Sequence, residues 1–203
     1  MTRYFLLALL LGLTFFRANA QQTEAFATLS DEQWTVLIQA LESEDWLKAA
    51  DYAAKYIKQI KEEDEEKSLA RLRYMFIYAS AGKVLQGKMT YEELDKALKA
   101  YVGKEVVTPA RPIVGDCKSS TMAGLCFPAD KERALFTAAT NKHGTNIHAF
   151  EYVQLQENFD YKRHEGKFAA IGGTVTSFML SPNQSRLWAM RIFIEKGYVL
   201  LDK

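Results

Sequence analysis

The sequence predicts an α+β protein with helices in its first half and strands in its second half. Apolar residues recur every three or four positions over residues 30–101, which is typical of amphipathic helices. Over residues 134–203 apolar and polar residues alternate in shorter runs, as in strands. Residues 102–133 separate the two patterns and hold three of the four prolines. Because 48% of the residues are hydrophobic, we expect a folded core.

Residues 1–20 are predicted to be a cleavable secretory signal. Arg3 supplies a positive charge, Leu6 to Leu13 form a short apolar stretch, and Ala18-Asn19-Ala20 has the small residues that precede a cleavage site. The alternative is an uncleaved anchor, but a spanning helix needs roughly 20 apolar residues. We therefore expect a periplasmic or secreted protein, cleaved near Ala20, with residues 21–29 as an N-terminal extension and no later membrane span.

Net charge argues against a dedicated nucleic-acid binder. Removal of Arg3 and Arg17 leaves 24 basic and 25 acidic residues, a net charge of −1, whereas such binders usually carry a basic excess. Residues 21–101 have a net charge of −4, and residues 131–203 have a net charge of +3. This asymmetry favours two folding units.

The two cysteines, Cys117 and Cys126, are predicted to form a disulfide, because an exported protein matures in an oxidising compartment. Closing so short a loop stabilises a protein by roughly 2.5–3 kcal/mol. The alternative is a redox or metal pair. The spacing is not CxxC, however, and no histidine lies between the cysteines.

Residues 30–101 are predicted to form a domain of four antiparallel helices. Ser30 and Gln33 match a capping box, and Thr90 and Glu93 match another. A second helix is predicted to start after Ser43 or Asp45. The three apolar stripes expected to face the core are Trp34, Leu37, Ile38 and Leu41; Trp46, Ala50, Ala53, Ile57 and Ile60; and Leu69, Leu72, Phe76 and Ala79.

Large aromatic residues alternate with alanine in this domain, at Trp46, Ala50, Ala53 and Tyr56. The pattern resembles tetratricopeptide-like helical hairpins, and the resemblance implies a surface that binds a protein partner. The alternative is a plain helical bundle whose aromatic residues lie in the core.

Residues 102–133 are predicted to be an irregular linker, closed by the disulfide, between the two units. Residues 134–203 are predicted to form an antiparallel sheet of about five strands with short connections. The paired glycines Gly172 and Gly173 indicate a bulge or bend, and Gly197 is predicted to turn the chain into the last strand.

The stretch from Gly166 to Thr176 (GKFAAIGGTVT) resembles the glycine-bent strand of an OB-fold. The resemblance implies a small barrel with a groove for oligonucleotides, oligosaccharides or peptides. A sheet packed on the helical unit is the alternative.

We predict no catalytic residue, cofactor or metal site, since the chain lacks the H-E-x-x-H, G-x-S-x-G, S-x-x-K and Walker A motifs. The first hypothesis is therefore an exported, non-catalytic binding protein. The second is an exported hydrolase that uses His148 or His164 with acidic residues. The third is an OB-like binder of an anionic polymer.

Five residues are candidates to face a ligand: Arg191, Tyr152, Lys162, Arg163 and His148. Arg191 is the most informative of them, because it alternates with Leu187, Ala189 and Phe193. A charge on a mostly apolar face should pair with a carboxylate or face a ligand. The alternative is that the aromatic residues are core and the cations are solvated.

Overall fold

The computed structural model describes residues 29–60, 66–117, 124–128 and 133–202. The predicted signal and residues 21–28 of the predicted extension lie outside these residues. Of the helices it describes, none is both long enough and apolar enough to cross a membrane.

The described part of the chain begins with four α-helices. Both predicted capping boxes are confirmed: Ser30 caps α2 with Gln33, and Thr90 caps α5 with Glu93. Asp45 caps α3 by accepting the Lys48 N–H at 3.3 Å. The helical elements are α2 (Asp31–Glu42), α3 (Trp46–Gln59), α4 (Glu66–Leu85), α5 (Tyr91–Leu98) and the short 3-10 helix η2 (Lys99–Tyr101).

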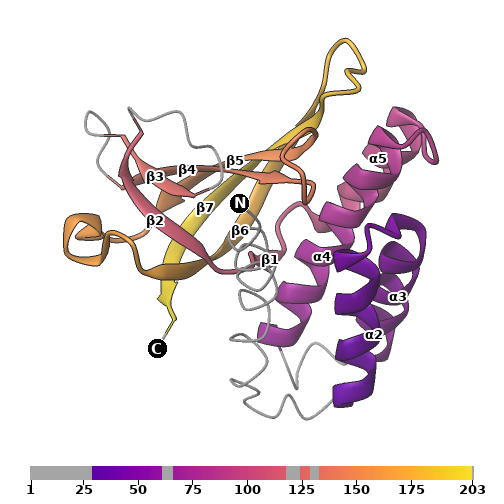
Figure 1. Cartoon of the computed structure of the whole chain (residues 1–203), viewed down its shortest axis with the longest axis horizontal. Helices are drawn as coiled ribbons and strands as arrows, with labels where there is room; N and C mark the ends of the chain where they lie inside the picture. The colour runs from indigo at the N-terminus through magenta and orange to yellow at the C-terminus, as the bar shows by residue number, and fades with distance from the viewer. Residues whose placement is uncertain (1–28, 61–65, 118–123, 129–132, 203) are drawn as a thin grey trace, which may run out of the picture.

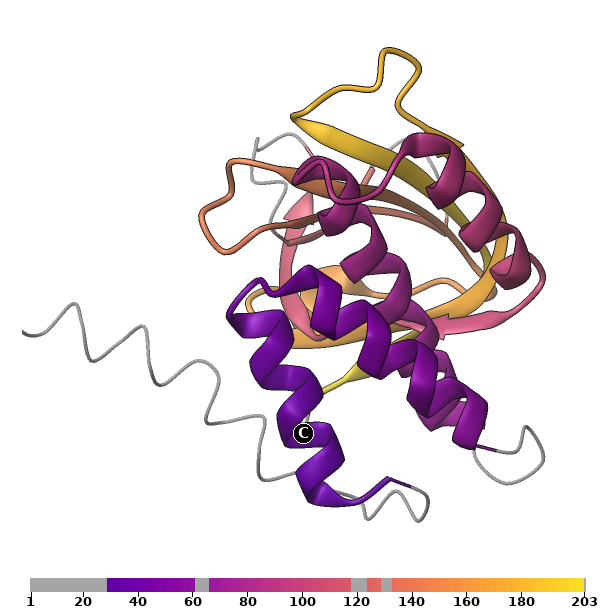
Figure 2. The same ribbon diagram turned by 90° about the vertical axis from the view of Figure 1, so that its right-hand side faces the viewer.

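The described residues of the second half form a mixed sheet of seven strands, in the order β1-β6-β2-β3-β4-β5-β7, with a further pairing of β6 with β7. That pairing closes six of the strands into a ring (Figures 1 and 2). The strands are β1 (Glu105–Val107), β2 (Arg111–Asp116), β3 (Leu125–Phe127), β4 (Ala134–Thr140), β5 (Ile147–Leu155), β6 (Phe168–Leu180) and β7 (Trp188–Leu201), and the 3-10 helix η3 (Tyr161–His164) precedes β6.

The α+β layout agrees with the sequence, but the sheet differs from the five antiparallel strands expected. It has seven strands, and the pairs β2–β3 and β5–β7 are parallel. The predicted linker at 102–133 supplies three of them. Two of these strands, β1 and β3, have three residues each, which is too short to show an alternating pattern.

The turn predicted at Gly197 is wrong, because β7 runs through this residue. Lys196 has φ = 51°, and the register of β7 against β5 shifts between Val153 and Leu155. The extra residue is therefore absorbed in a bulge, which bends a strand without ending it.

Neither family resemblance is confirmed. The closed ring has six strands, whereas an OB-fold has five. Helix α4 packs against α3 on one side and against β1, β5 and β7 on the other, and Figure 1 shows it between the outer helices and the strands. The domain boundaries at residues 101 and 134 stay predictions.

Helix α4 joins the helices to the strands through a shared core. Tyr74, Ile77, Ala81 and Val84 belong to the same hydrophobic cluster as the barrel interior. Leu69, Leu72 and Ala79 belong instead to the cluster formed with α2 and α3. A helix that is apolar on opposite sides is buried between two layers.

Candidate functional site

The outer surface of β4, β5 and β7 carries a row of aromatic side chains. Met190, Ile192 and Ile194 are buried, so Arg191 and Phe193, which alternate with them, point outward. Register extends this face across the neighbouring strands, since Phe150 lies beside Arg191 and Tyr152 lies between Phe136 and Phe193. We call this surface the aromatic face; it comprises Phe136, Phe150, Tyr152, Trp188, Arg191 and Phe193.

The rings of the aromatic face contact one another across the strands. Tyr152 stacks on Phe193 with centroids 5.3 Å apart and meets Phe136 edge-on at 5.0 Å. Phe150 meets Trp188 edge-on at 5.8 Å. All these side chains are partly exposed. The rings therefore form two contacting groups in one layer at the surface, one around Tyr152 and one around Trp188.

Arg191 lies over this layer. Its Cζ atom is 6.0 Å from the centroid of the Tyr152 ring and 5.6 Å from that of Trp188, within the range of cation–π attraction. Its Nη1 approaches the Met179 sulfur at 3.9 Å, and its buried Nε has no hydrogen-bond partner. In the described part of the chain no carboxylate pairs with Arg191. The carboxylate partner that the sequence allows for this arginine is thus not found among the described residues, and contact with a ligand stays a prediction.

The structure thus brings together two of the five predicted candidates, Arg191 and Tyr152, and places the other three elsewhere. His148 is buried among the helices. Its ring stacks on Tyr78 with centroids 4.3 Å apart and meets Trp46 edge-on at 4.6 Å. Lys162 and Arg163 are exposed in η3.

The surroundings of His148 hold its ring in one neutral form. The Nδ1 atom lies 3.1 Å from the Tyr78 carbonyl oxygen, which only accepts, so Nδ1 carries the proton and Nε2 is an acceptor. Burial lowers the pKa of His148 to about 4. A recess of about 80 Å³ beside the ring is lined by Glu44, Asn141 and other residues. A neutral, enclosed imidazole of this kind is typical of a structural histidine.

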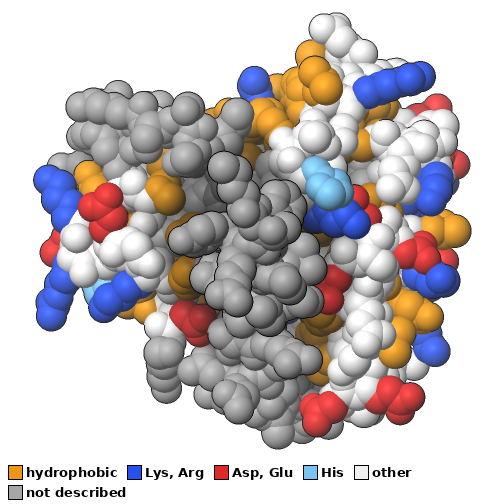
Figure 3. All heavy atoms as spheres, in the orientation of Figure 1, with side chains coloured by type: hydrophobic (Ala, Val, Ile, Leu, Met, Phe, Trp, Pro, Cys, Tyr) orange, Lys and Arg blue, Asp and Glu red, His pale blue; other side chains and the backbone are white. Residues whose placement is uncertain are grey.

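The basic residues of η3 lie at the far end of the barrel from the helices, where Lys and Arg side chains gather on the left of Figure 3. Tyr161 stacks on Phe127 with centroids 4.8 Å apart, which fixes η3 against β3. Asp160 caps this short helix by accepting the Arg163 N–H at 3.4 Å. Lys162 and Arg163 therefore belong to a surface separate from the aromatic face.

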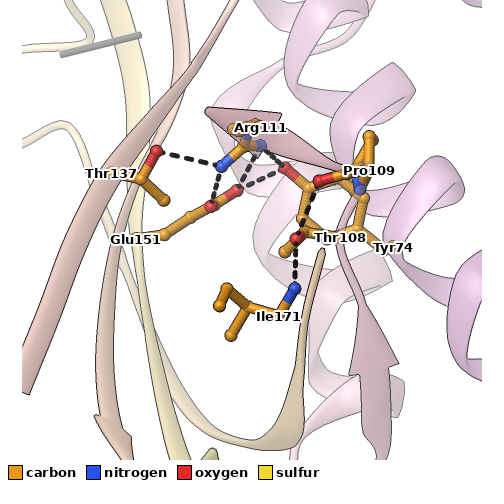
Figure 4. A network of polar contacts seen from close by, with 7 residues as sticks. All are labelled: Tyr74, Thr108, Pro109, Arg111, Thr137, Glu151 and Ile171. Carbon is orange, nitrogen blue, oxygen red and sulfur yellow. Dashed lines mark hydrogen bonds and ion pairs between the residues drawn. The ribbon is translucent and has the colours of Figure 1, made fainter. Parts of the chain in front are cut away.

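A buried polar network lies on the inner side of β5, opposite the aromatic face (Figure 4). Arg111 forms an ion pair with Glu151 and donates to Thr137 at 3.2 Å. The Tyr74 hydroxyl donates to Glu151 and accepts from Arg111 Nη2 at 2.7 Å. Glu151 is 1% exposed, so this network ties α4, β2, β4 and β5 together in the interior.

Electrostatics in this network favour the charged pair and a neutral tyrosine. Burial raises the pKa of Tyr74 well above its usual value, despite the opposing effect of Arg111. Desolvation is the largest single effect on Arg111 and lowers its pKa, but the charges of Glu151 and Tyr74 and the hydrogen bonds to both residues together raise the pKa above its usual value. Sequence reasoning missed this network, although Glu151 as a lone acid in an apolar strand is a usable signal.

The sulfur atoms of Cys117 and Cys126 lie at disulfide distance, with Cα atoms 4.9 Å apart. The bond joins the end of β2 to β3. Among the described residues, no group of three or more His, Cys, Asp or Glu side chains is placed to hold a metal ion. A second recess, of about 420 Å³, opens between the start of α5 and the β6–β7 loop, and its lining includes Thr90, Glu92 and Arg186.

Comparison with known proteins gives no further guide: no protein-family model matches the chain, and neither a curated protein nor a solved structure matches it significantly.

Proposed function

We propose that this is an exported, non-catalytic binding protein that recognises a protein partner through its aromatic face. The observation that carries the proposal is Arg191, a cation held over the rings of Tyr152 and Trp188 with no carboxylate beside it among the described residues. A charge placed on an apolar layer is costly unless a partner satisfies it. The partner therefore supplies a carboxylate within an apolar surface.

The composition of the aromatic face supports a protein as the partner. Tyr, Trp and Arg are the residues enriched at interface hot spots, and all three occur here. Lys, Glu and Asp are depleted from interface cores, and none is among the six residues that define the face, although Glu195 lies further along the outer side of β7. The large hydrophobic residues that are exposed also lie mainly in the β half, which supports a binding surface there: Met179 is 47% exposed and Leu187 is 68% exposed.

The proposed export is supported by the secretory signal predicted at residues 1–20 and by the disulfide between Cys117 and Cys126. Stable disulfides are rare in a reducing cytoplasm and common outside it. Mass spectrometry of native material tests this part of the proposal. We expect a chain that begins near residue 21 and has no free thiol; an intact Met1 with two thiols would contradict export.

The other candidate functions have less support. A hydrolase based on His148 would use an imidazole enclosed by Trp46 and Tyr78. An anionic-polymer binder would use Lys162 and Arg163 together with the rings of Phe150, Tyr152 or Trp188, but the two cations lie on η3, apart from the aromatic face. The tetratricopeptide-like resemblance implies a partner that binds the helices. On the described helices α2 to α5, however, Leu47 is the one large hydrophobic residue that is exposed, so these helices offer little apolar surface.

Photo-crosslinking in the native compartment tests the proposed face. A photoreactive residue replaces Met179, at the rim of the face, in three backgrounds: wild type, Arg191→Glu and the matched control Lys162→Glu. We expect crosslinks to a protein in the wild type and the control, and loss of most of them with Arg191→Glu. Crosslinks that are equally strong in all three backgrounds would overturn the assignment of the face.

A further inference from the structure

Strand β7 carries opposite charges on its outer surface, on either side of an aromatic ring. Arg191, Phe193 and Glu195 alternate with the buried Met190, Ile192 and Ile194. All three therefore point to the same side of the barrel. The order along the strand is cation, ring and anion.

Neither charge is neutralised within the described part of the protein. Glu195 is exposed, and it takes part in none of the ion pairs of the described residues, as is also true of Arg191. Four residues along a strand span about 13 Å, so the two side chains are too far apart to pair with each other.

This order is self-complementary. A two-fold axis at Phe193, perpendicular to the strand, exchanges the positions of cation and anion. Two copies placed face to face with antiparallel β7 strands then bring each arginine opposite the glutamate of the other copy. Isologous contacts of this kind, in which residue i meets j and j meets i, are the commonest interfaces of soluble oligomers.

We propose that a second copy of this chain covers the aromatic face, in a two-fold dimer where Arg191 pairs with Glu195 of the partner subunit. The proposal rests on the proposed function, that this face binds a protein, and it names the partner. A second copy satisfies both charges at once, at the spacing that β7 sets. An unrelated partner would have to present a carboxylate and a cation at that same spacing.

The size of the face indicates how strong this dimer is. The face on β4, β5 and β7, together with its rim on β6, is about 19 Å wide, and residues 188–195 are about 26 Å long. The footprint is thus on the order of 500 Å² per copy, below the roughly 800 Å² of a standard stable interface. We expect a reversible dimer with a dissociation constant in the micromolar range.

Sedimentation equilibrium of the purified, oxidised mature chain over a micromolar concentration series tests the dimer. Arg191→Glu places two carboxylates opposite each other, and Glu195→Arg places two cations opposite each other. We expect each single reversal to weaken dimerisation about tenfold or more, which is about 1.4 kcal/mol. The double reversal restores the pairing and is expected to dimerise within about threefold of wild type.

Lys162→Glu, which reverses an exposed cation on η3, is the matched control and is expected to dimerise as the wild type does. Circular dichroism verifies that each variant is folded. A wild-type chain that stays monomeric throughout the series would overturn the dimer, as would a dimer unaffected by the single reversals or not restored by the double. If Arg191→Glu still abolishes crosslinks to a different protein, the proposed function stands while the dimer falls.

Discussion

Two arginines lie on opposite sides of the barrel wall, and in the part of the chain that the structure describes only Arg111 of the two has a carboxylate partner. Arg111 points inward and pairs with Glu151, with Tyr74 and Thr137 completing its hydrogen bonds (Figure 4). Arg191 points outward over Tyr152 and Trp188, with no ion pair among the described residues. The fold itself supplies the hydrogen-bond and ion-pair partners of Arg111, whereas Arg191 is available to a binding partner. Loss of the first should therefore cost stability, and loss of the second should cost binding.

The largest effect is expected when the inner pair is broken. Glu151→Ala leaves Arg111 buried without its carboxylate, and removing one partner of a buried ion pair costs about 3–5 kcal/mol. Urea denaturation of the oxidised mature protein measures the free energy of unfolding. A loss below about 1 kcal/mol would show that the pair is not structural.

The control is the double variant Arg111→Met with Glu151→Leu. It removes both charges and fills the space with apolar atoms, so it leaves no unpaired charge. We expect it to recover most of the stability that Glu151→Ala loses.

The next largest effect is a loss of stability at low pH caused by the buried His148, which lies on the helix side of the sheet. Burial lowers the pKa of His148 to about 4 in the folded protein, against 6.5 for a free side chain. As pH falls, the unfolded chain binds the proton first. The stabilisation is therefore complete above about pH 6.5 and declines as pH falls towards 4, by up to roughly 3 kcal/mol.

Urea denaturation at a series of pH values measures this decline. A His148→Phe variant keeps an aromatic ring beside Trp46 and Tyr78 but cannot be protonated, so its stability should depend less on pH in this range. Equal pH dependence in the two proteins would contradict the assignment of this decline to His148.

The smallest effect on stability is expected for a substitution of Arg191, on the outer side of the barrel. Arg191→Met keeps an unbranched side chain over the rings and removes a charge that has no partner among the described residues. We expect the free energy of unfolding to change by no more than about 0.5 kcal/mol. Thermal or urea denaturation measures it, and a loss similar to that of Glu151→Ala would remove the contrast between the two arginines.

The elements with a strong local signal could be predicted from the sequence. The capping boxes at Ser30 and Thr90 mark two helix starts, and the helical period extends over the region that holds all four helices. Strands β1 and β3 could not be predicted, because three residues show no period. The sequence predicts a turn at Gly197 where the structure has a bulge at Lys196, since a local pattern does not distinguish a bent strand from one that ends.

Part of the candidate site can also be predicted from the sequence, because its signal is local. Arg191 stands out in the sequence because it interrupts an apolar alternation, and this signal is local. Lys162 and Arg163 were grouped with it only by closeness along the chain, and the fold separates them. The pairing of Arg111 with Glu151 joins residues 40 positions apart, which no local pattern shows.

Ring closure also limits how a partner can approach. Strand β5 is hydrogen-bonded to β4 and β7, and β7 is hydrogen-bonded to β5 and β6. Neither strand offers a free edge, so an incoming chain cannot extend the sheet there by backbone pairing, which is the common route to edge-to-edge aggregation. Selectivity for a partner at this surface is therefore set by side chains alone. Single substitutions can change that selectivity without changing the fold of the barrel.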